Sequence, residues 1–125
     1  MSLVVQKFGG TSVASVELIQ NVARKVMASR AAGHQVVVVV SAMGHETDRL
    51  DDLAKAVSAD TEQVQREIDV LLSTGEQVSA ALLAMTLIKA GAPSKSYTGG
   101  QVKILTDNAH NKARILDIDV DRLKA

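Results

Sequence analysis

Residues 36–44 read VVVVVSAMG, and this stretch decides the fold class. A strand with one wet face alternates apolar and polar residues, whereas five consecutive valines predict a strand buried on both faces. The run ends at Ser41 and Gly44, residue types that are common in the turn after a strand. Strands covered on both faces are typical of α/β proteins, in which helices pack on the two sides of a parallel sheet.

The residues before this strand predict an earlier strand and a helix, so the three elements form a strand-helix-strand unit. Residues 3–5, Leu-Val-Val, form a second apolar run, also predicted to be buried on both faces, that leads to Gly9-Gly10. Ser15 is the expected N-cap of the intervening helix, and Gly33 its expected C-cap. Such a unit implies parallel strands joined by a right-handed crossover. The apolar residues at helical spacing are Ile19, Val22, Ala23, Val26 and Met27.

The middle of the chain predicts three more helices. Apolar spacing places one over residues 50–57 and another over residues 64–72. Ser73-Thr74-Gly75 interrupts that pattern, and Thr74 with Gln77 would form a capping box for a third helix. This last helix, over residues 78–90, is apolar on most faces and is expected to be buried.

Beyond Pro93 the pattern is weaker. Residues 95–97 and 102–105 predict short strands, and apolar residues alternate with aspartates over residues 116–120. Residues 121–124 are typical of the start of a helix. We therefore expect the chain to stop inside an element that continues, as a fragment would.

Charge and composition exclude several functional classes. The 125 residues fit one domain of ordinary size. Fourteen Lys and Arg balance fourteen Asp and Glu, so the chain lacks the overall positive charge that attracts nucleic acid. One Tyr, one Phe and no Trp leave few side chains on which bases could stack. We expect no nucleic-acid partner.

The cysteine content and the hydropathy pattern point to a compartment. The absence of cysteine excludes disulfides and a thiol nucleophile and suits a reducing cytoplasm. The longest unbroken apolar run covers residues 80–85, whereas a membrane-spanning helix needs about 20 residues. The first seven residues lack the features of a signal peptide. We expect a soluble, cytoplasmic chain with no membrane partner.

Lys7-Phe8-Gly9-Gly10-Thr11-Ser12 is the first candidate binding segment. A glycine pair directly after a strand lets the backbone approach a ligand closely, and the helix that follows would offer N–H groups and its positive dipole end to an anion. Lys7 could add a positive charge for a phosphate. The alternative is a tight turn beside a surface lysine, because the segment matches neither of the common phosphate-loop spacings.

Two further segments carry polar residues that could bind a ligand. Ser41 follows the valine strand at its carboxyl end, where ligand crevices of α/β sheets lie. Thr47 and Asp48 would open the next helix, and N-capping is the favoured explanation for them in isolation. Glu76 could hold a ligand ammonium or merely complement the dipole at the start of a helix. His45 lacks a metal-ligand companion, so we expect no metal site.

Taken together, these segments resemble the N-terminal part of the aspartate kinases, within the amino acid kinase family. The resemblance rests on three motifs in order: Lys7-Phe8-Gly9-Gly10-Thr11-Ser12-Val13, Ser41-Ala42-Met43-Gly44 with Thr47-Asp48, and Ser73-Thr74-Gly75-Glu76-Gln77-Val78-Ser79. It implies a three-layer α/β/α sandwich with a mainly parallel sheet, truncated here. It also implies that the γ-phosphoryl group of ATP, with Mg²⁺, is transferred to the β-carboxylate of L-aspartate.

The resemblance implies a role for each segment. Lys7 would be catalytic and would face the ATP phosphates together with Phe8, Gly9, Gly10, Thr11 and Ser12. Ser41, Thr47 and Glu76 would hold aspartate. Residues 1–125 would form the N-terminal portion of the kinase domain, without its second half and its regulatory ACT domains.

Two further expectations concern the chain as a whole. Lacking half of the nucleotide site, the chain alone is expected to be inactive and to form a homo-oligomer or to associate with a covering partner. The alternative is a naturally short, non-catalytic binding or assembly module of the same fold.

Overall fold

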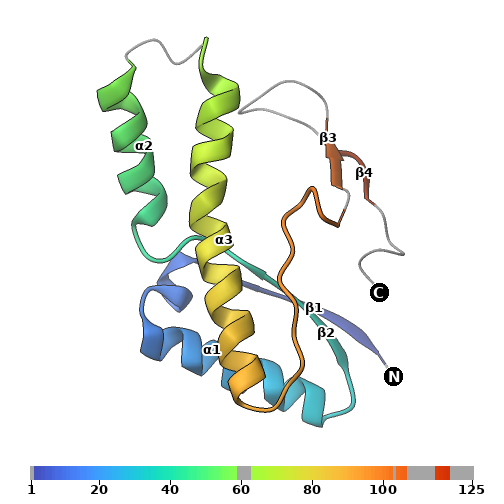
Figure 1. The fold of residues 1–125 in the computed structure, drawn as a ribbon. Helices are drawn as coiled ribbons and strands as arrows, with labels where there is room; N and C mark the ends of the chain where they lie inside the picture. Colours follow the sequence, from blue (N-terminus) through green and yellow to red (C-terminus); the bar gives the residue numbers. More distant parts are fainter. Residues whose placement is uncertain (1, 59–62, 103, 107–114, 119–125) are drawn as a thin grey trace.

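The structure is a computed structural model of the chain that describes residues 2–58, 63–102, 104–106 and 115–118. Figure 1 shows how the strands and helices are arranged. In chain order the elements are β1 (Leu3–Phe8), a short 3-10 helix η1 (Gly10–Val13), α1 (Val16–Ala31), β2 (Gln35–Val40), α2 (Glu46–Val57), α3 (Gln65–Lys89), β3 (Ile104–Thr106) and β4 (Ile115–Ile118).

The strand-helix-strand unit predicted from the sequence is confirmed. β1 and β2 pair in parallel, in a register that runs from Leu3 opposite Gln35 to Phe8 opposite Val40. At the start of α1, the Ser15 hydroxyl accepts a hydrogen bond from the Leu18 N–H at 3.2 Å, as expected of an N-cap.

α1 ends where the sequence predicted. Its C-cap is Ala32, and Gly33 follows directly. The Gly33 φ of +96° is a left-handed conformation that glycine adopts without strain. The Gly33 N–H donates to the Arg30 carbonyl and the His34 N–H to the Ser29 carbonyl, which is the Schellman pattern. Gly91 ends α3 in the same way, with a φ of +94°.

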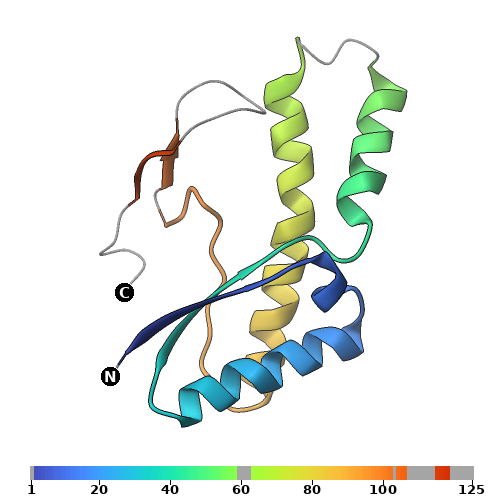
Figure 2. The same cartoon turned by 180° about the vertical axis from the view of Figure 1, so that it is seen from behind.

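The core lies on one face of the two strands. Buried residues of α1 and α3 pack there against strand residues such as Phe8 and Val38. The opposite face is open: Leu3 is 48% exposed, Val5 63% and Val39 47%. Figure 2 shows the two strands from the side away from the lower half of α3. The prediction that both strands are covered on both faces is therefore wrong for the described chain, because its helices cover only one side.

α3 is one continuous helix, so the predicted break at Ser73-Thr74-Gly75 is wrong. The hydroxyls of Ser73 and Thr74 donate to the carbonyls of Val70 and Leu71, at 2.8 and 2.6 Å. This bonding back to the preceding turn satisfies both side chains inside a helix. Thr74 consequently caps nothing, and the predicted capping box with Gln77 does not form.

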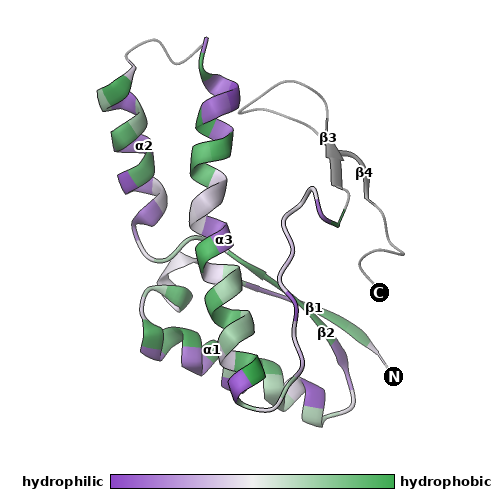
Figure 3. Ribbon diagram, viewed as in Figure 1, coloured by the Kyte–Doolittle hydropathy of each residue, from purple (hydrophilic) through white to green (hydrophobic). Residues whose placement is uncertain are grey.

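Only one stripe of α3 is buried, although burial of most faces was expected. Gly75, Ser79, Leu83 and Leu87 are buried at a spacing of four residues. Val78, Met85 and Ile88 are exposed. Figure 3 shows apolar residues on much of this helix and on both strands.

In length and composition α3 is also long and apolar enough to cross a membrane. The longest unbroken apolar run in the sequence, residues 80–85, is much shorter than this helix. The criterion is weak evidence, because core helices of soluble proteins meet it too.

The C-terminal part differs from the prediction in detail. β3 and β4 pair antiparallel, and they overlap the strands expected over residues 102–105 and 116–120. Residues 95–97 form no strand. The helix expected from residue 121 lies outside the described residues.

Candidate functional site

The three candidate segments meet around one buried residue, Ala42. Ala42 is 3% exposed and lies in the loop between β2 and α2. A Cβ placed on Gly10 would lie 3.0 Å from the carbonyl oxygens of Ala42 and Gly44. From α3, a Cβ placed on Gly75 would lie 2.9 Å from the Ala42 Cβ. Because both neighbours are glycine, the first and third segments pack directly onto the second.

The loop after β1 is a 3-10 turn, which corrects the expected geometry. Gly9 precedes η1, and the Ser12 N–H donates to the Gly9 carbonyl at 3.0 Å. α1 begins only at Val16, behind its own Ser15 cap, so its N-terminus does not follow the glycine pair. In an i to i+3 turn the first N–H groups, here those of Gly10 and Thr11, have no partner inside the turn.

Lys7 lies near the end of β1 on the open face of the sheet. The exposed positions of β1 alternate with half-buried ones, so Lys7 shares its face with Leu3 and Val5. In the described part of the chain its ammonium group makes no ion pair. Lys7 is thus available to an anion that approaches the carboxyl end of β1.

The loop after β2 is tied to the loop after β1 by backbone hydrogen bonds. The Ser41 N–H donates to the Phe8 carbonyl at 3.1 Å, and the Gly44 N–H donates to the Gly10 carbonyl at 3.0 Å. Gly44 has a φ of +50°. Ser41 is half-buried at the carboxyl end of β2. The two loops therefore form one backbone unit at this edge of the sheet.

Thr47 and Asp48 lie inside the first turn of α2, so the capping explanation for them is wrong. The cap position belongs to His45, which makes no side-chain cap hydrogen bond. Thr47 is exposed. His45 faces Asp48, with 3.4 Å between Nδ1 and Oδ2. No cluster of metal-ligating side chains occurs among the described residues.

Glu76 lies well inside α3, immediately after Gly75, and is exposed. It therefore cannot complement the dipole of a helix N-terminus, which was the alternative explanation for it. Within residues 2–58 and 63–102 its carboxylate has no ion-pair partner. Its position excludes the helix-dipole explanation, and its role in ligand binding stays a prediction.

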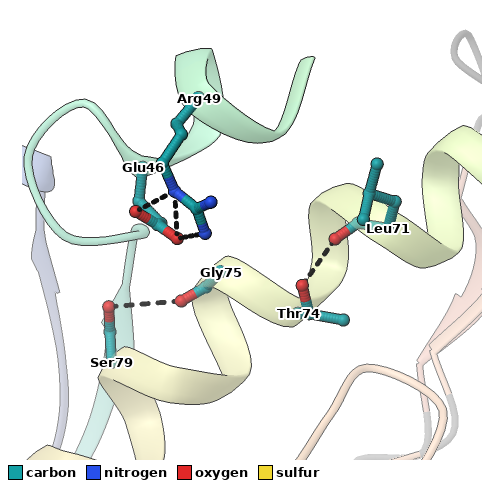
Figure 4. Close-up of polar contacts among 6 residues, drawn as sticks. All are labelled: Glu46, Arg49, Leu71, Thr74, Gly75 and Ser79. Atoms are coloured by element: carbon teal, nitrogen blue, oxygen red, sulfur yellow. Dashed lines mark hydrogen bonds and ion pairs between the residues drawn. The ribbon is translucent and has the colours of Figure 1, made fainter. Parts of the chain in front are cut away.

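One feature of this region was not predicted. Arg49 donates from Nε to both carboxylate oxygens of Glu46, at 3.1 Å each, and from Nη2 to Oε1. Figure 4 shows this pair beside Gly75. The hydrogen bonds from Arg49 hold the pKa of Glu46 below its ordinary value. The spacing of three residues in a helix was the signal that could have revealed the pair.

A pocket of about 280 Å³ lies elsewhere, where α1 and α3 end. It shares no residue with the three segments. Its lining residues are Met27, Arg30, Ala31, Gly91, Ala92 and Pro93.

Comparison with known proteins supplies independent evidence. Residues 2–125 match the model of the amino acid kinase family. The chain is 62% identical, over 124 residues, to an aspartate kinase of Pseudomonas fluorescens and 56% identical, over 123 residues, to aspartokinase 2 of Bacillus subtilis. These matches cover 99% and 98% of the chain and 30% of each relative. The chain thus spans about 30% of the length of these curated relatives.

A solved structure agrees with these matches. The crystal structure of aspartate kinase from Synechocystis superimposes with a TM-score of 0.74 at 54% sequence identity. The match covers 78% of this chain and 16% of that one. The expected fold class, a truncated α/β fold with a parallel sheet, agrees with this likeness.

Proposed function

The chain belongs to the amino acid kinase family, and from this premise we propose that it forms the part of an aspartate kinase that holds the ATP phosphates and the aspartate substrate. The reaction would transfer the γ-phosphoryl group of ATP to the β-carboxylate of L-aspartate, an entry step to amino-acid biosynthesis that leads to lysine and threonine. The observation that carries the proposal is the packing of all three motifs around Ala42. The relatives' names support it.

The demands of this reaction fit the residues at the sheet edge. A carboxylate nucleophile is already ionised at neutral pH, so the site needs no general base. It must instead bring two anions together and offset their repulsion. Lys7 supplies a positive charge on the open face, and we assign it the catalytic role of stabilising charge on the transferred group.

The loop after β1 would bind the phosphates. Gly10 and Thr11 start a 3-10 turn, so their N–H groups can donate to a ligand. Gly9 has no atom within 4 Å of an added Cβ, which leaves space beside its backbone. Phe8 precedes this loop and Ser12 lies within it, and we keep both in the proposed phosphate segment.

The other two segments would bind aspartate. Ser41 lies at the carboxyl end of β2, and Thr47 in the first turn of α2. Glu76 lies on α3, next to the glycine that contacts Ala42. Its carboxylate is suited to the substrate ammonium, and the two hydroxyls are suited to the substrate carboxylates.

Of the two groups expected with the reaction, the described residues fit only the nucleotide. Backbone N–H groups and Lys7 suit the phosphates of ATP. The described side chains include no cluster that could hold Mg²⁺, so we assign no metal ligand in this chain and derive no step through the metal.

The rest of the proposal concerns the chain as a whole. We propose that residues 1–125 are the N-terminal portion of a kinase domain in a cytoplasmic enzyme that associates with itself or with a covering partner. The short-module alternative is not favoured, because the relatives are named as kinases and are about three times as long.

The proposal is tested on the full-length gene product. Incubation with ATP, Mg²⁺ and hydroxylamine should convert aspartate to its hydroxamate, because hydroxylamine traps acyl phosphates. Glutamate and N-acetylglutamate serve as controls for specificity. A product from either control acid and none from aspartate would contradict the assignment.

A further inference from the structure

The Glu46–Arg49 pair lies where the two proposed aspartate-binding helices meet. Glu46 is the first residue of α2, and Thr47 follows it. The Glu46 Cγ lies 3.8 Å from the Cβ position of Gly75, and Glu76 follows Gly75 on α3. Glu46 therefore connects α2 to α3 at a point next to both residues that are proposed to bind aspartate, Thr47 and Glu76.

The conformation of Glu46 is fixed from its exposed side. The Arg49 side chain is 60% exposed and the Glu46 side chain 33%, so Glu46 lies between Arg49 and the packed junction. Both carboxylate oxygens accept from the guanidinium group. A two-point contact fixes direction as well as distance, which a single contact to a lysine would not do.

The inner side of Glu46 contacts buried, closely packed residues. Gly75 is buried, and the Leu50 Cδ1 lies 3.5 Å from its Cβ position. Leu50 itself is 6% exposed. The Glu46 Cγ is the third contact at this position, after the Ala42 Cβ and the Leu50 Cδ1, so a Glu46 side chain turned towards water would remove one of the three.

We infer that Arg49 is a positioning residue: by holding Glu46 over Gly75 it keeps Thr47 and Glu76 at a fixed separation for the amino-acid substrate. This inference rests on the proposed function. It assigns Arg49 no contact with substrate. The effect should fall on the amino-acid side of the site, because Glu46 contacts Gly75 of α3, whereas Gly10 of the phosphate loop packs on the carbonyl groups of Ala42 and Gly44.

Steady-state kinetics of Arg49→Met in the full-length gene product test this inference. Methionine keeps an unbranched side chain and removes every donor. We expect the KM for aspartate to rise about fivefold, as suits a partly exposed pair, with kcat and the KM for ATP within about twofold. Arg49→Lys should recover part of the loss. The matched control is Lys55→Met, which removes the exposed Lys55–Asp51 pair of the same helix.

The outcomes separate the two proposals. If the unsubstituted protein forms no ADP in response to aspartate, the proposed function fails and this inference with it. If it is active and Arg49→Met matches Lys55→Met in its KM for aspartate, only the inference fails. A uniform change in kcat and both KM values, with no recovery in Arg49→Lys, would also overturn it, because that is the pattern of general destabilisation.

Discussion

The methyl group of Ala42 fills the space that a side chain at Gly75 would need. The two Cβ atoms would be 2.9 Å apart, closer than side chains pack. α3 can therefore cross the loop after β2 this closely only if residue 75 is glycine, which has no side chain beyond a hydrogen atom. The glycine that made the sequence look like a helix break is what allows the helix to pass.

Gly75→Ala should destabilise the protein even though alanine favours a helix. The gain in helix propensity, up to about 1 kcal/mol, is outweighed by an overlap that typically costs about 1–3 kcal/mol. Chemical denaturation should show a net loss, and the double variant Gly75→Ala/Ala42→Gly should recover part of it. Gly100→Ala is the control, since its nearest contact would be an ordinary 3.9 Å. Equal stability of the two single variants would refute the packing argument.

Lys7→Ala in the full-length gene product should lower kcat on the order of 10²-fold, as loss of a single group that stabilises developing charge does. The KM for aspartate should change little. Lys25→Ala, at an exposed position of α1, controls for the loss of a positive charge. Turnover equal to that control would leave Lys7 as a surface residue beside a tight turn.

Glu76→Gln should raise the KM for aspartate more than tenfold, because a charge-assisted contact typically contributes about 1.5–3 kcal/mol. The KM for ATP should stay near normal. The melting temperature should not fall, since Glu76 is exposed inside α3 and caps nothing. Glu67→Gln, in the first turn of α3, is the matched control. A lower melting temperature with unchanged kinetics would point to a structural role.

Acid should weaken the Glu46–Arg49 contact. Hydrogen bonds from Arg49 hold the pKa of Glu46 below the ordinary 4.5, so the pair stabilises the folded state above that value. The contribution is lost as the pH falls through the lower pKa of the folded state. Thermal unfolding at pH 6 and about pH 3 should therefore show a larger drop for the unsubstituted protein than for Glu46→Gln. Glu17→Gln should behave like the unsubstituted protein, and equal drops in all three would exclude the effect.

The isolated 125-residue chain should self-associate and should not consume ATP in response to aspartate. Its sheet exposes Leu3, Val5 and Val39 on one face, and exposed apolar faces and strand edges favour pairing with another chain. Sedimentation at several concentrations should show association that Val5→Thr and Val39→Thr weaken. Val16→Thr, exposed at the start of α1, should not. A monomer that turns over aspartate would contradict both expectations.

The sequence was most informative where local chemistry determines structure. The valine run, the Ser15 cap and Gly33 depend on neighbours in the chain, and all three led to correct elements. It was least informative where a distant contact decides. Nothing in residues 73–75 reveals that Ala42 lies against Gly75, so the break there was predicted on sound local grounds.

The candidate site shows the same division. The motifs named the three segments that meet. The first two follow parallel strands, which end at one edge of a sheet, whereas the third lies inside α3. The roles of Lys7, Ser41, Thr47 and Glu76 remain predictions. The Glu46–Arg49 pair was missed because its spacing is common on helix surfaces, and only its place beside Gly75 distinguishes it.

Because α3 is unbroken, residues along it keep fixed positions relative to one another. Glu76 and Leu87 lie about 16 Å apart along its axis, at 1.5 Å per residue, with no hinge between them. Leu87 is fixed in the core against α1 and the strands. Glu76 lies on the Leu87 side of residues 73–75, so bending there would not move it relative to the core. A change in the distance between Glu76 and Lys7 therefore requires α3 to move as a rigid body against the core. The packing around Leu87 thus helps to fix the position of Glu76.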